Sequence, residues 1–283
     1  MRYILIVILS GMFSAGAYAA ADSSGVKKPS LTLAAIYGSN ASYYGQTTAE
    51  RLPYILTNAS LRMPGGFYLS GSAYRLLNMG GSGISAMDAS AGFNWDLGAD
   101  LTAGIGYTRS FYPENSPLLQ AGNNNTASAS IGYDWQIFET DLDGDYSFGA
   151  EQDVFVSLSN SKWINLGGIG RDEGYFTLEP SVEVVGGTRH YLEEYTIRKS
   201  RREQMQDWIR NPLFPPGQDK TETVTSSRTS FDLMSWNISL PIGYNRGNYL
   251  LEAGYQVSVP GKKISPDSRG MHSFFNLSFY YQF

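Results

Sequence analysis

Large hydrophobic residues alternate with polar residues along most of this chain. In residues 272–283, which close the sequence, every second residue is a large hydrophobe and the residues between them are mostly polar. Residues 87–95, 176–184 and 249–257 have the same period of two. Successive side chains of a β-strand point to opposite sides, so this pattern predicts strands with one apolar face and one mostly polar face.

Stretches of this kind recur at short intervals, separated by segments rich in Gly, Pro and Asn. The connections alternate between tight turns, such as Pro64-Gly65-Gly66, and longer polar loops. The alternation changes phase at Ile137-Phe138, and a slip of one residue would turn every side chain to the wrong face, so we expect a tight turn there. The pattern predicts about twelve strands, an even number that puts both ends of the mature chain on one side.

The apolar faces of these strands have no helical segment to cover them. Aromatic residues gather at the ends of the apolar faces, namely Trp95, Tyr107, Phe111, Trp135, Trp236, Tyr244, Tyr249, Phe275 and Phe283. Aromatic girdles at two interfaces are typical of a transmembrane β-barrel. We therefore expect an all-β fold, a transmembrane antiparallel up-and-down β-barrel of about twelve strands. A secreted or periplasmic β-sandwich is the alternative.

The N-terminal residues have the features of a secretory signal peptide. Arg2 precedes an apolar stretch over residues 4–14, and the small residues Ala17 and Ala19 follow it. We expect cleavage after Ala19, which leaves residues 20–283 as the mature barrel. An uncleaved anchor is the alternative, but the apolar run is shorter than the ~20 residues that a spanning helix needs.

Composition agrees with an exported all-β protein. The chain has 20 Tyr, 14 Phe and 31 Gly but no Cys, and its net charge of −5 argues against a nucleic-acid partner. After the signal peptide, no run of 18 or more apolar residues follows, so the sequence predicts no helical membrane span.

Taken together, the leader, the alternating strands and the aromatic final strand resemble the Gram-negative outer-membrane β-barrel proteins. In that superfamily, a last strand with alternate aromatics and a C-terminal Phe is the signal for the barrel-insertion machinery. The matching positions here are Phe275, Leu277, Phe279, Tyr281 and Phe283. The resemblance implies export to the outer membrane, with outer-membrane lipid, lipopolysaccharide and the barrel-insertion machinery as partners. It covers the whole mature chain and says little about function.

Acidic residues dominate the polar faces, which face the lumen in a barrel. They are Asp88, Asp134, Glu139, Asp141, Asp143, Asp145, Glu179, Glu183 and Glu252. Glu139, Asp141, Asp143 and Asp145 share one strand face and form what we call the acidic ladder. Like carboxylates in a low-dielectric wall repel one another, so they need counter-ions, water or a basic partner. The ladder indicates either a lumen that favours cations or ion pairing and hydrogen bonding inside a closed barrel.

A long charged insert occupies about residues 193–230, on the extracellular side if the connections alternate. Its basic residues are Arg198, Lys199, Arg201, Arg202 and Arg210. Residues 197–209 have roughly helical spacing, and the segment Asn211-Pro212 ends any helix. Three interpretations stay open: the insert folds into the mouth and pairs with the acidic ladder, lies near lipopolysaccharide phosphates, or is a solvated loop.

The sequence predicts no enzyme and no cofactor. His190 and His272 are the only imidazoles, and there is no metal-ligand cluster, phosphate loop or nucleotide motif. The twelve-stranded outer-membrane phospholipases need a His and a Ser two residues apart on one face, whereas His272 and Ser273 are adjacent on opposite faces. The favoured function is a narrow, cation-favouring channel or small-solute porin for small cationic solutes. A non-conducting structural or adhesin-like barrel is the alternative, followed by an outer-membrane lipid-modifying enzyme.

Overall fold

The computed structural model describes residues 28–42, 44, 51–78, 83–112, 123–149, 152–168, 174–198, 221–261 and 270–283, with side chains of residues 189–229 excepted. The expected signal peptide therefore lies outside the described residues. The chain divides into two compact units, residues 1–187 with 232–283, and residues 188–231.

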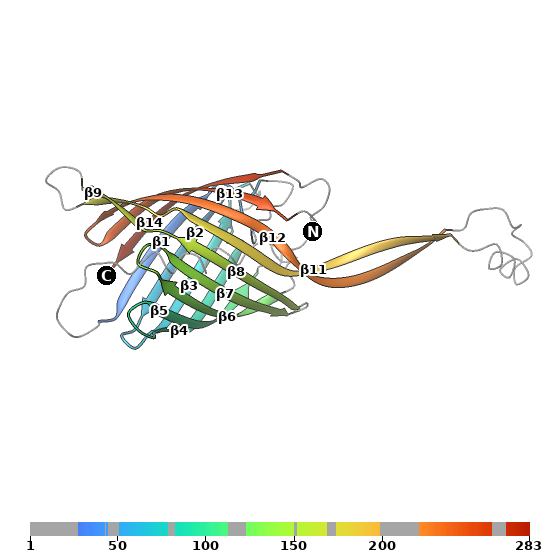
Figure 1. Ribbon diagram of the computed structural model, residues 1–283, viewed down its shortest axis with the longest axis horizontal. Coiled ribbons are helices and arrows are strands. Elements are labelled where there is room, and N and C mark those ends of the chain that lie inside the picture. The colour runs from blue at the N-terminus through green and yellow to red at the C-terminus, as the bar shows by residue number, and fades with distance from the viewer. Residues whose placement is uncertain are drawn as a thin grey trace, which may run out of the picture. The chain divides into compact units, whose positions relative to one another are not determined.

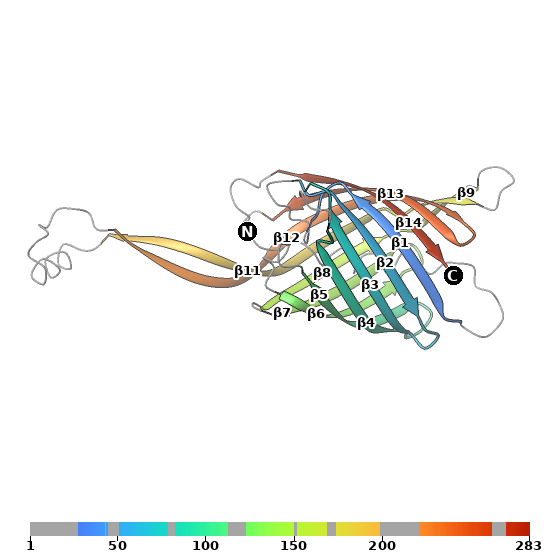
Figure 2. The same ribbon diagram turned by 180° about the vertical axis from the view of Figure 1, so that it is seen from behind.

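Fourteen strand segments make one antiparallel sheet (Figures 1 and 2). In chain order they are β1 (Ser30–Gly38), β2 (Tyr54–Arg62), β3 (Phe67–Leu76), β4 (Ala86–Asp96), β5 (Leu101–Phe111), β6 (Asn123–Asp134), β7 (Glu139–Gly149), β8 (Gln152–Ser161), β9 (Ile164–Gly168), β10 (Tyr175–Leu178), β11 (Ser181–Arg198), β12 (Thr221–Arg246), β13 (Tyr249–Pro260) and β14 (His272–Gln282). Neighbours in sequence are neighbours in the sheet from β1 to β8 and from β12 to β14.

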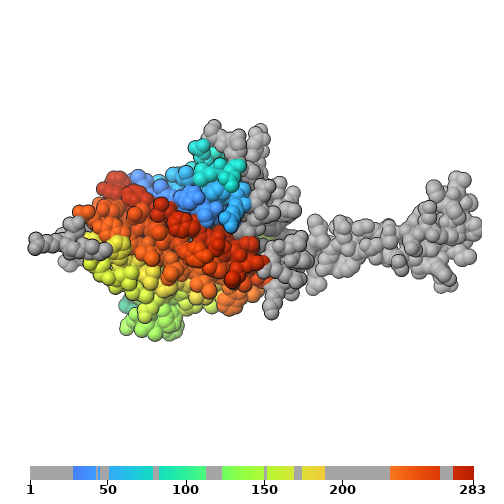
Figure 3. Space-filling view, turned by 90° about the horizontal axis from the view of Figure 1, so that it is seen from above, coloured from blue at the N-terminus to red at the C-terminus, as the bar shows by residue number. Residues whose placement is uncertain are grey.

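The sheet closes on itself. β1 pairs with β14, so the red C-terminal residues lie beside the blue N-terminal ones (Figure 3), and β11 pairs with both β8 and β12. β8 and β9 are two parts of one long strand, broken at Lys162 and Trp163, and β10 and β11 are two parts of another, broken at Glu179 and Pro180. Proline has no N–H to donate, so it interrupts the ladder there. Counted in this way, the barrel has twelve strands, as the sequence predicted.

Exposure of side chains alternates along the strands in the predicted phase. On β1, Leu33 and Tyr37 are exposed, at 41% and 39%, whereas Ile36 is buried. On β14, Phe275, Leu277, Phe279 and Phe283 are likewise exposed. An apolar belt that runs round a closed barrel is not stable in water, and a hydrocarbon layer is the environment that it fits. The fold is that of a transmembrane β-barrel.

Aromatic rings gather at the end of the barrel where β14 finishes, which we call the C-terminal rim. Contacting rings along this rim are Phe93 with Trp95, Tyr133 with Trp135, Phe176 with Tyr244, Tyr249 with Phe279, and Tyr281 with Phe283, their centroids 4.6 to 6.3 Å apart. Such a girdle is expected where the apolar belt meets a membrane interface. The opposite end of the barrel, where β1 finishes at Gly38, is called the loop rim.

The tight turn expected at Ile137-Phe138 is confirmed. Residues 135–138 join β6 to β7, and the N–H of Trp135 donates to the carbonyl of Phe138. Gln136 has a φ of 69°, and its N–H donates to Oδ1 of Asp134 at 2.6 Å. An Asp side chain that accepts from the backbone two residues ahead makes an Asx-turn, so Asp134 stabilises this turn.

Two expected connections differ from the structure. β9 occupies the start of the Gly-rich segment 165–174, which is of the kind expected to connect strands. β11 runs to Arg198 and β12 begins at Thr221, so both ends of the insert expected at 193–230 are strand. The Thr and Val residues near Thr221 favour strands, a signal that the charges of the insert obscured. The central part, residues 199–220, lies outside the described residues, as does most of the helix expected there. Among the residues described, no helix could cross a membrane.

Candidate functional site: the barrel interior

The inner faces of the strands form two contrasting regions. We call the inner faces of β14 and β1–β4 the tyrosine wall, and those of β7, β8 and β11–β13 the acidic wall. Both are built by the same alternation, since the residues between the exposed hydrophobes point inward. The two regions are described separately because their inward side chains differ in chemistry.

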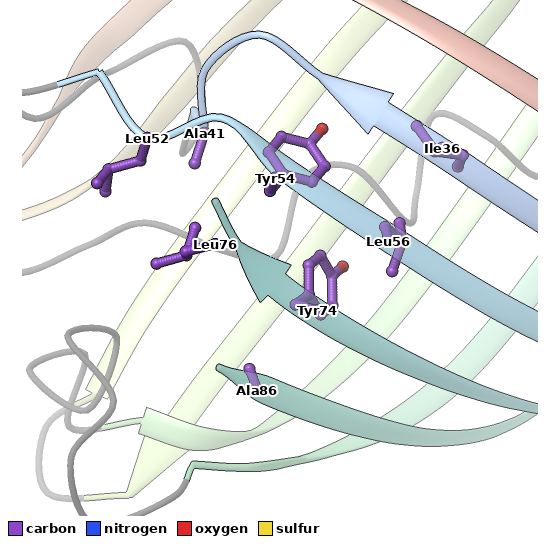
Figure 4. Close-up of a cluster of buried hydrophobic side chains, with 8 residues drawn as sticks. All are labelled: Ile36, Ala41, Leu52, Tyr54, Leu56, Tyr74, Leu76 and Ala86. Atoms are coloured by element: carbon purple, nitrogen blue, oxygen red, sulfur yellow. The ribbon is translucent and has the colours of Figure 1, made fainter. Parts of the chain in front are cut away.

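An apolar cluster occupies the tyrosine wall near the loop rim (Figure 4). It consists of Ile36, Ala41, Leu52, Tyr54, Leu56, Tyr74, Leu76 and Ala86. The ring centroids of Tyr54 and Tyr74 are 6.4 Å apart, and Leu56, in register with Tyr74, is 1% exposed. Burial of this degree means that these side chains pack against one another and are shielded from water, so this part of the interior is filled.

Hydrogen bonds between side chains link the acidic wall. The amide of Asn237 donates to Oε2 of Glu183 at 2.7 Å, and the hydroxyl of Ser258 donates to Oδ1 of Asn237 at 2.5 Å. Nearer the loop rim, the amide of Asn123 donates to Oδ2 of Asp153 at 2.7 Å. These polar groups satisfy one another, as most buried polar groups do. Asp153, which is 1% exposed, is an inward acid that the sequence analysis missed.

The acidic ladder runs along β7 from the C-terminal rim towards the loop rim. Glu139, Asp141 and Asp143 are half-buried, whereas Asp145 is buried, at 8% exposed. In register beside them on β8 are Ser161, Ser159, Ser157 and Phe155. The first three carboxylates therefore retain access to the lumen, and the fourth is enclosed.

The remaining acidic residues are spread over the interior. Glu252 on β13 is half-buried and in register with Ser278. Glu179 lies at the break between β10 and β11, where its N–H donates to the carbonyl of Pro241 at 3.2 Å. Asp88 is buried on β4, within the tyrosine wall. The structure thus brings most of these acids to one side of the barrel and separates Asp88 from them, while Asp134 belongs to the turn at the rim.

Tyr44 crosses the interior from one region to the other. It follows β1 in the chain, yet its hydroxyl donates to Oδ2 of Asp145 at 2.9 Å and its ring stacks on Phe155 with centroids 3.9 Å apart. The hydroxyl of Ser235 on β12 donates to the carbonyl of Tyr44 at 2.6 Å. Between β1 and β7 the barrel has β2–β6 on one side and β8 and β11–β14 on the other. The chain therefore crosses the interior between the end of β1 and Tyr44, and Tyr44 lies against the acidic wall near the loop rim.

The structure describes little of the basic insert and gives no sign of a metal site among the described residues. Side chains of the basic residues Arg198, Lys199, Arg201, Arg202 and Arg210 lie outside the described residues, although Arg198 itself ends β11. In the part of the chain that the structure describes, no group of three His, Cys, Asp or Glu residues is placed to hold a metal ion.

Comparison with known proteins leaves this chain without an assigned family. No protein-family model and no curated protein match the sequence. Among solved structures, the KdgM porin matches with 8% identity and a TM-score of 0.48, covering 90% of this chain and 99% of its own. The NanC porin matches with 8% identity and a TM-score of 0.45, covering 89% and 98%. An outer membrane channel from Pseudomonas putida F1 matches with 11% identity and a TM-score of 0.47, covering 93% and 98%. The similarity is weak, and the barrel is assigned from the chain's own strand pairing.

Proposed function

We propose that this protein is an outer-membrane channel for small cationic solutes, with a lumen constricted at Tyr44. The observation that carries the proposal is the acidic ladder: three half-buried carboxylates, Glu139, Asp141 and Asp143, lie in a row on the inner face of a closed barrel whose outer face is apolar. Closely spaced carboxylates in a lumen with low-dielectric walls attract cations and repel anions.

The expected placement in the cell follows from this role. The C-terminal rim faces the periplasm and the loop rim faces outward, after export by the signal peptide of residues 1–19. The acidic ladder then begins near the periplasmic mouth and leads towards Tyr44. A pairing between the basic insert and the ladder remains a prediction.

A non-conducting barrel is the second candidate, and a specific observation favours it. The apolar cluster and Tyr44 fill much of the interior near the loop rim, where Leu56, Tyr44 and Ser235 are at most 2% exposed. Barrels of eight strands are filled by their own side chains, whereas those of sixteen leave an aqueous channel. A barrel of twelve strands lies between these cases, so conductance has to be measured.

Single-channel recording in planar bilayers tests the proposal, with purified wild-type protein and the double variant Asp141→Asn with Asp143→Asn. The wild type should conduct and favour cations over anions. The variant should lose much of that preference. The loss should be most visible at low salt, because at 0.1 M salt the field of a charge is already screened beyond ~10 Å. Asp96→Asn with Asp100→Asn, which removes the same charge at the C-terminal rim, should have a smaller effect. A folded barrel that never conducts, or one whose selectivity is unchanged by the ladder variant, would contradict the proposal.

Assembly can be tested separately. We propose that Phe275, Leu277, Phe279, Tyr281 and Phe283 form the signal read by the barrel-insertion machinery. Deletion of Phe283 should lower the amount of heat-modifiable protein in isolated outer membranes several-fold, whereas Phe283→Trp should restore most of it. Equal amounts of inserted protein in the wild type and the deletion variant would remove this role.

A further inference from the structure

Tyr44 is held by two neighbouring groups of the acidic wall, in the manner of a bound ligand. The centroid of its ring lies 3.9 Å from that of Phe155, with an angle of 16° between the planes, and its hydroxyl donates to Asp145 at 2.9 Å. Asp145 and Phe155 are in register on adjacent strands. A flat apolar surface and a carboxylate acceptor are therefore fixed side by side on the rigid sheet, which is how specific sites are built.

Two features of Tyr44 favour its replacement by a ligand at this place. Its φ of 49° is in the left-handed region, which is uncommon and strained for a non-glycine residue. Its hydroxyl is a neutral donor, whereas a cationic N–H donor makes a shorter and roughly twice as strong hydrogen bond to a carboxylate. A ligand with the same ring and a cationic donor would make a stronger hydrogen bond to Asp145 than the hydroxyl of Tyr44 does.

The acidic ladder provides a path to this place. Asp143 and Asp141 lie on the same inner face of β7 as Asp145, successively nearer the C-terminal rim, and both are only half-buried. A cation drawn in by these two carboxylates meets Asp145 and Phe155 next. Apolar and polar groups converge there, as is usual in small-molecule sites.

We propose that Asp145 and Phe155 form a binding site for planar aromatic cations, occupied in this structure by Tyr44 as an internal competitor. Phe155 stacks on the aromatic ring of the solute and Asp145 accepts from its cationic N–H group. The site names a solute class for the proposed channel and in that respect rests on the proposed function. Binding itself does not require conduction.

Isothermal titration calorimetry on the full chain, folded in detergent micelles, tests the site with benzamidinium as the probe. The variant Tyr44→Ala should bind benzamidinium at least ~10-fold more tightly than the wild type, because the competitor is gone. In that background, Asp145→Asn and Phe155→Leu should each weaken binding at least ~10-fold, since the first removes the charge and the second the stacking ring. Guanidinium, which has no ring, and benzoate, which is an anion, should bind weakly to every variant.

A matched control separates the internal competitor from a general effect of losing a tyrosine. Tyr37→Ala removes a tyrosine of β1 that faces outward, at 39% exposed, and should leave benzamidinium binding unchanged. Heat-modifiable gel mobility confirms that each variant is folded. No gain in affinity in Tyr44→Ala, or no loss on adding Asp145→Asn, overturns the site. Binding with this pattern in a barrel that does not conduct would support the site and contradict the channel, whereas conduction without binding would do the reverse.

Discussion

Near the loop rim of the tyrosine wall, inward side chains of β1–β4 pack apolar surface together, whereas on the acidic wall those of β11–β13 are linked by hydrogen bonds. Nearer the C-terminal rim the tyrosine wall also has such bonds, from the amide of Asn58 to the hydroxyls of Ser70 and Ser72. Leu56 and Ile36 illustrate the first arrangement, at 1% and 2% exposed. Asn237 illustrates the second, since it both donates to Glu183 and accepts from Ser258. The same alternation of inward and outward residues therefore supports two kinds of interior in one barrel.

This difference bears on what the lumen can do. An apolar region excludes water and fixes the shape of the interior, because interiors are close-packed and have few voids. A hydrogen-bonded acidic region keeps polar atoms available to a solute. Tyr44 follows β1 of the tyrosine wall in the chain and contacts the acidic wall, so the proposed constriction lies on the acidic side of the interior.

The largest expected effect comes from Leu56→Ala, which opens a cavity in the tyrosine wall. Loss of a buried Leu side chain should lower the free energy of unfolding by about 2–5 kcal/mol. Reversible urea unfolding in lipid vesicles, followed by tryptophan fluorescence, measures this change. The control Ile55→Ala removes the neighbouring outward side chain, 40% exposed, and should cost less because lipid occupies the space. Equal costs would mean that the apolar cluster is not a packed core.

A second comparison distinguishes the outer face from the inner face in the middle of β6. Ala129 faces outward, whereas its neighbour Ser130 faces inward, exposed and in register with Asp143. Arginine on the lipid face near the midplane costs about 2–4 kcal/mol, so Ala129→Arg should be destabilising by this amount.

Ser130→Arg should cost much less than Ala129→Arg, because its guanidinium can reach water in the lumen and the carboxylate of Asp143. The same urea unfolding experiment measures both variants. A larger cost at Ser130 than at Ala129 would reverse the assignment of the two faces and, with it, the position of the acidic ladder.

Much of the fold was predictable from the sequence for a physical reason. Lipid outside and polar groups inside impose a strict period of two, and the period identified the strands, their faces, their number and the turn after Asp134. Outward aromatics such as Trp95 and Phe283 were identified by the same rule.

The pattern fails where both faces are apolar. Near Ile36 the outward Tyr37 is also apolar, and Leu56 follows the outward Ile55, so alternation cannot tell which residues point inward. The apolar cluster of the tyrosine wall was therefore missed.

The local pattern of hydrophobic and polar residues could not predict contacts across the lumen. Tyr44 lies 101 residues from Asp145 in the chain, and no periodicity links a loop residue to the opposite strand. Phe155 lies between Val154 and Val156, an apolar run that does not reveal its inward direction. Only the closed barrel brings these groups together.

The smallest expected effects come from two buried serines, one in each region, that differ in hydrogen bonding. Ser258 on the acidic wall donates to Asn237, whereas the hydroxyl of Ser60, on β2 in the tyrosine wall, has no hydrogen-bond partner among the described residues. Removing a paired hydroxyl leaves its partner unsatisfied and costs about 1–3 kcal/mol, whereas removing an unpaired one forfeits no hydrogen bond. Ser258→Ala should therefore lower the free energy of unfolding by about 1 kcal/mol, and Ser60→Ala should leave it unchanged or raise it slightly.

The measurement is again urea unfolding in vesicles. If Ser60→Ala costs as much as Ser258→Ala, an ordered water satisfies the hydroxyl of Ser60, and the two serines do not differ in hydrogen bonding.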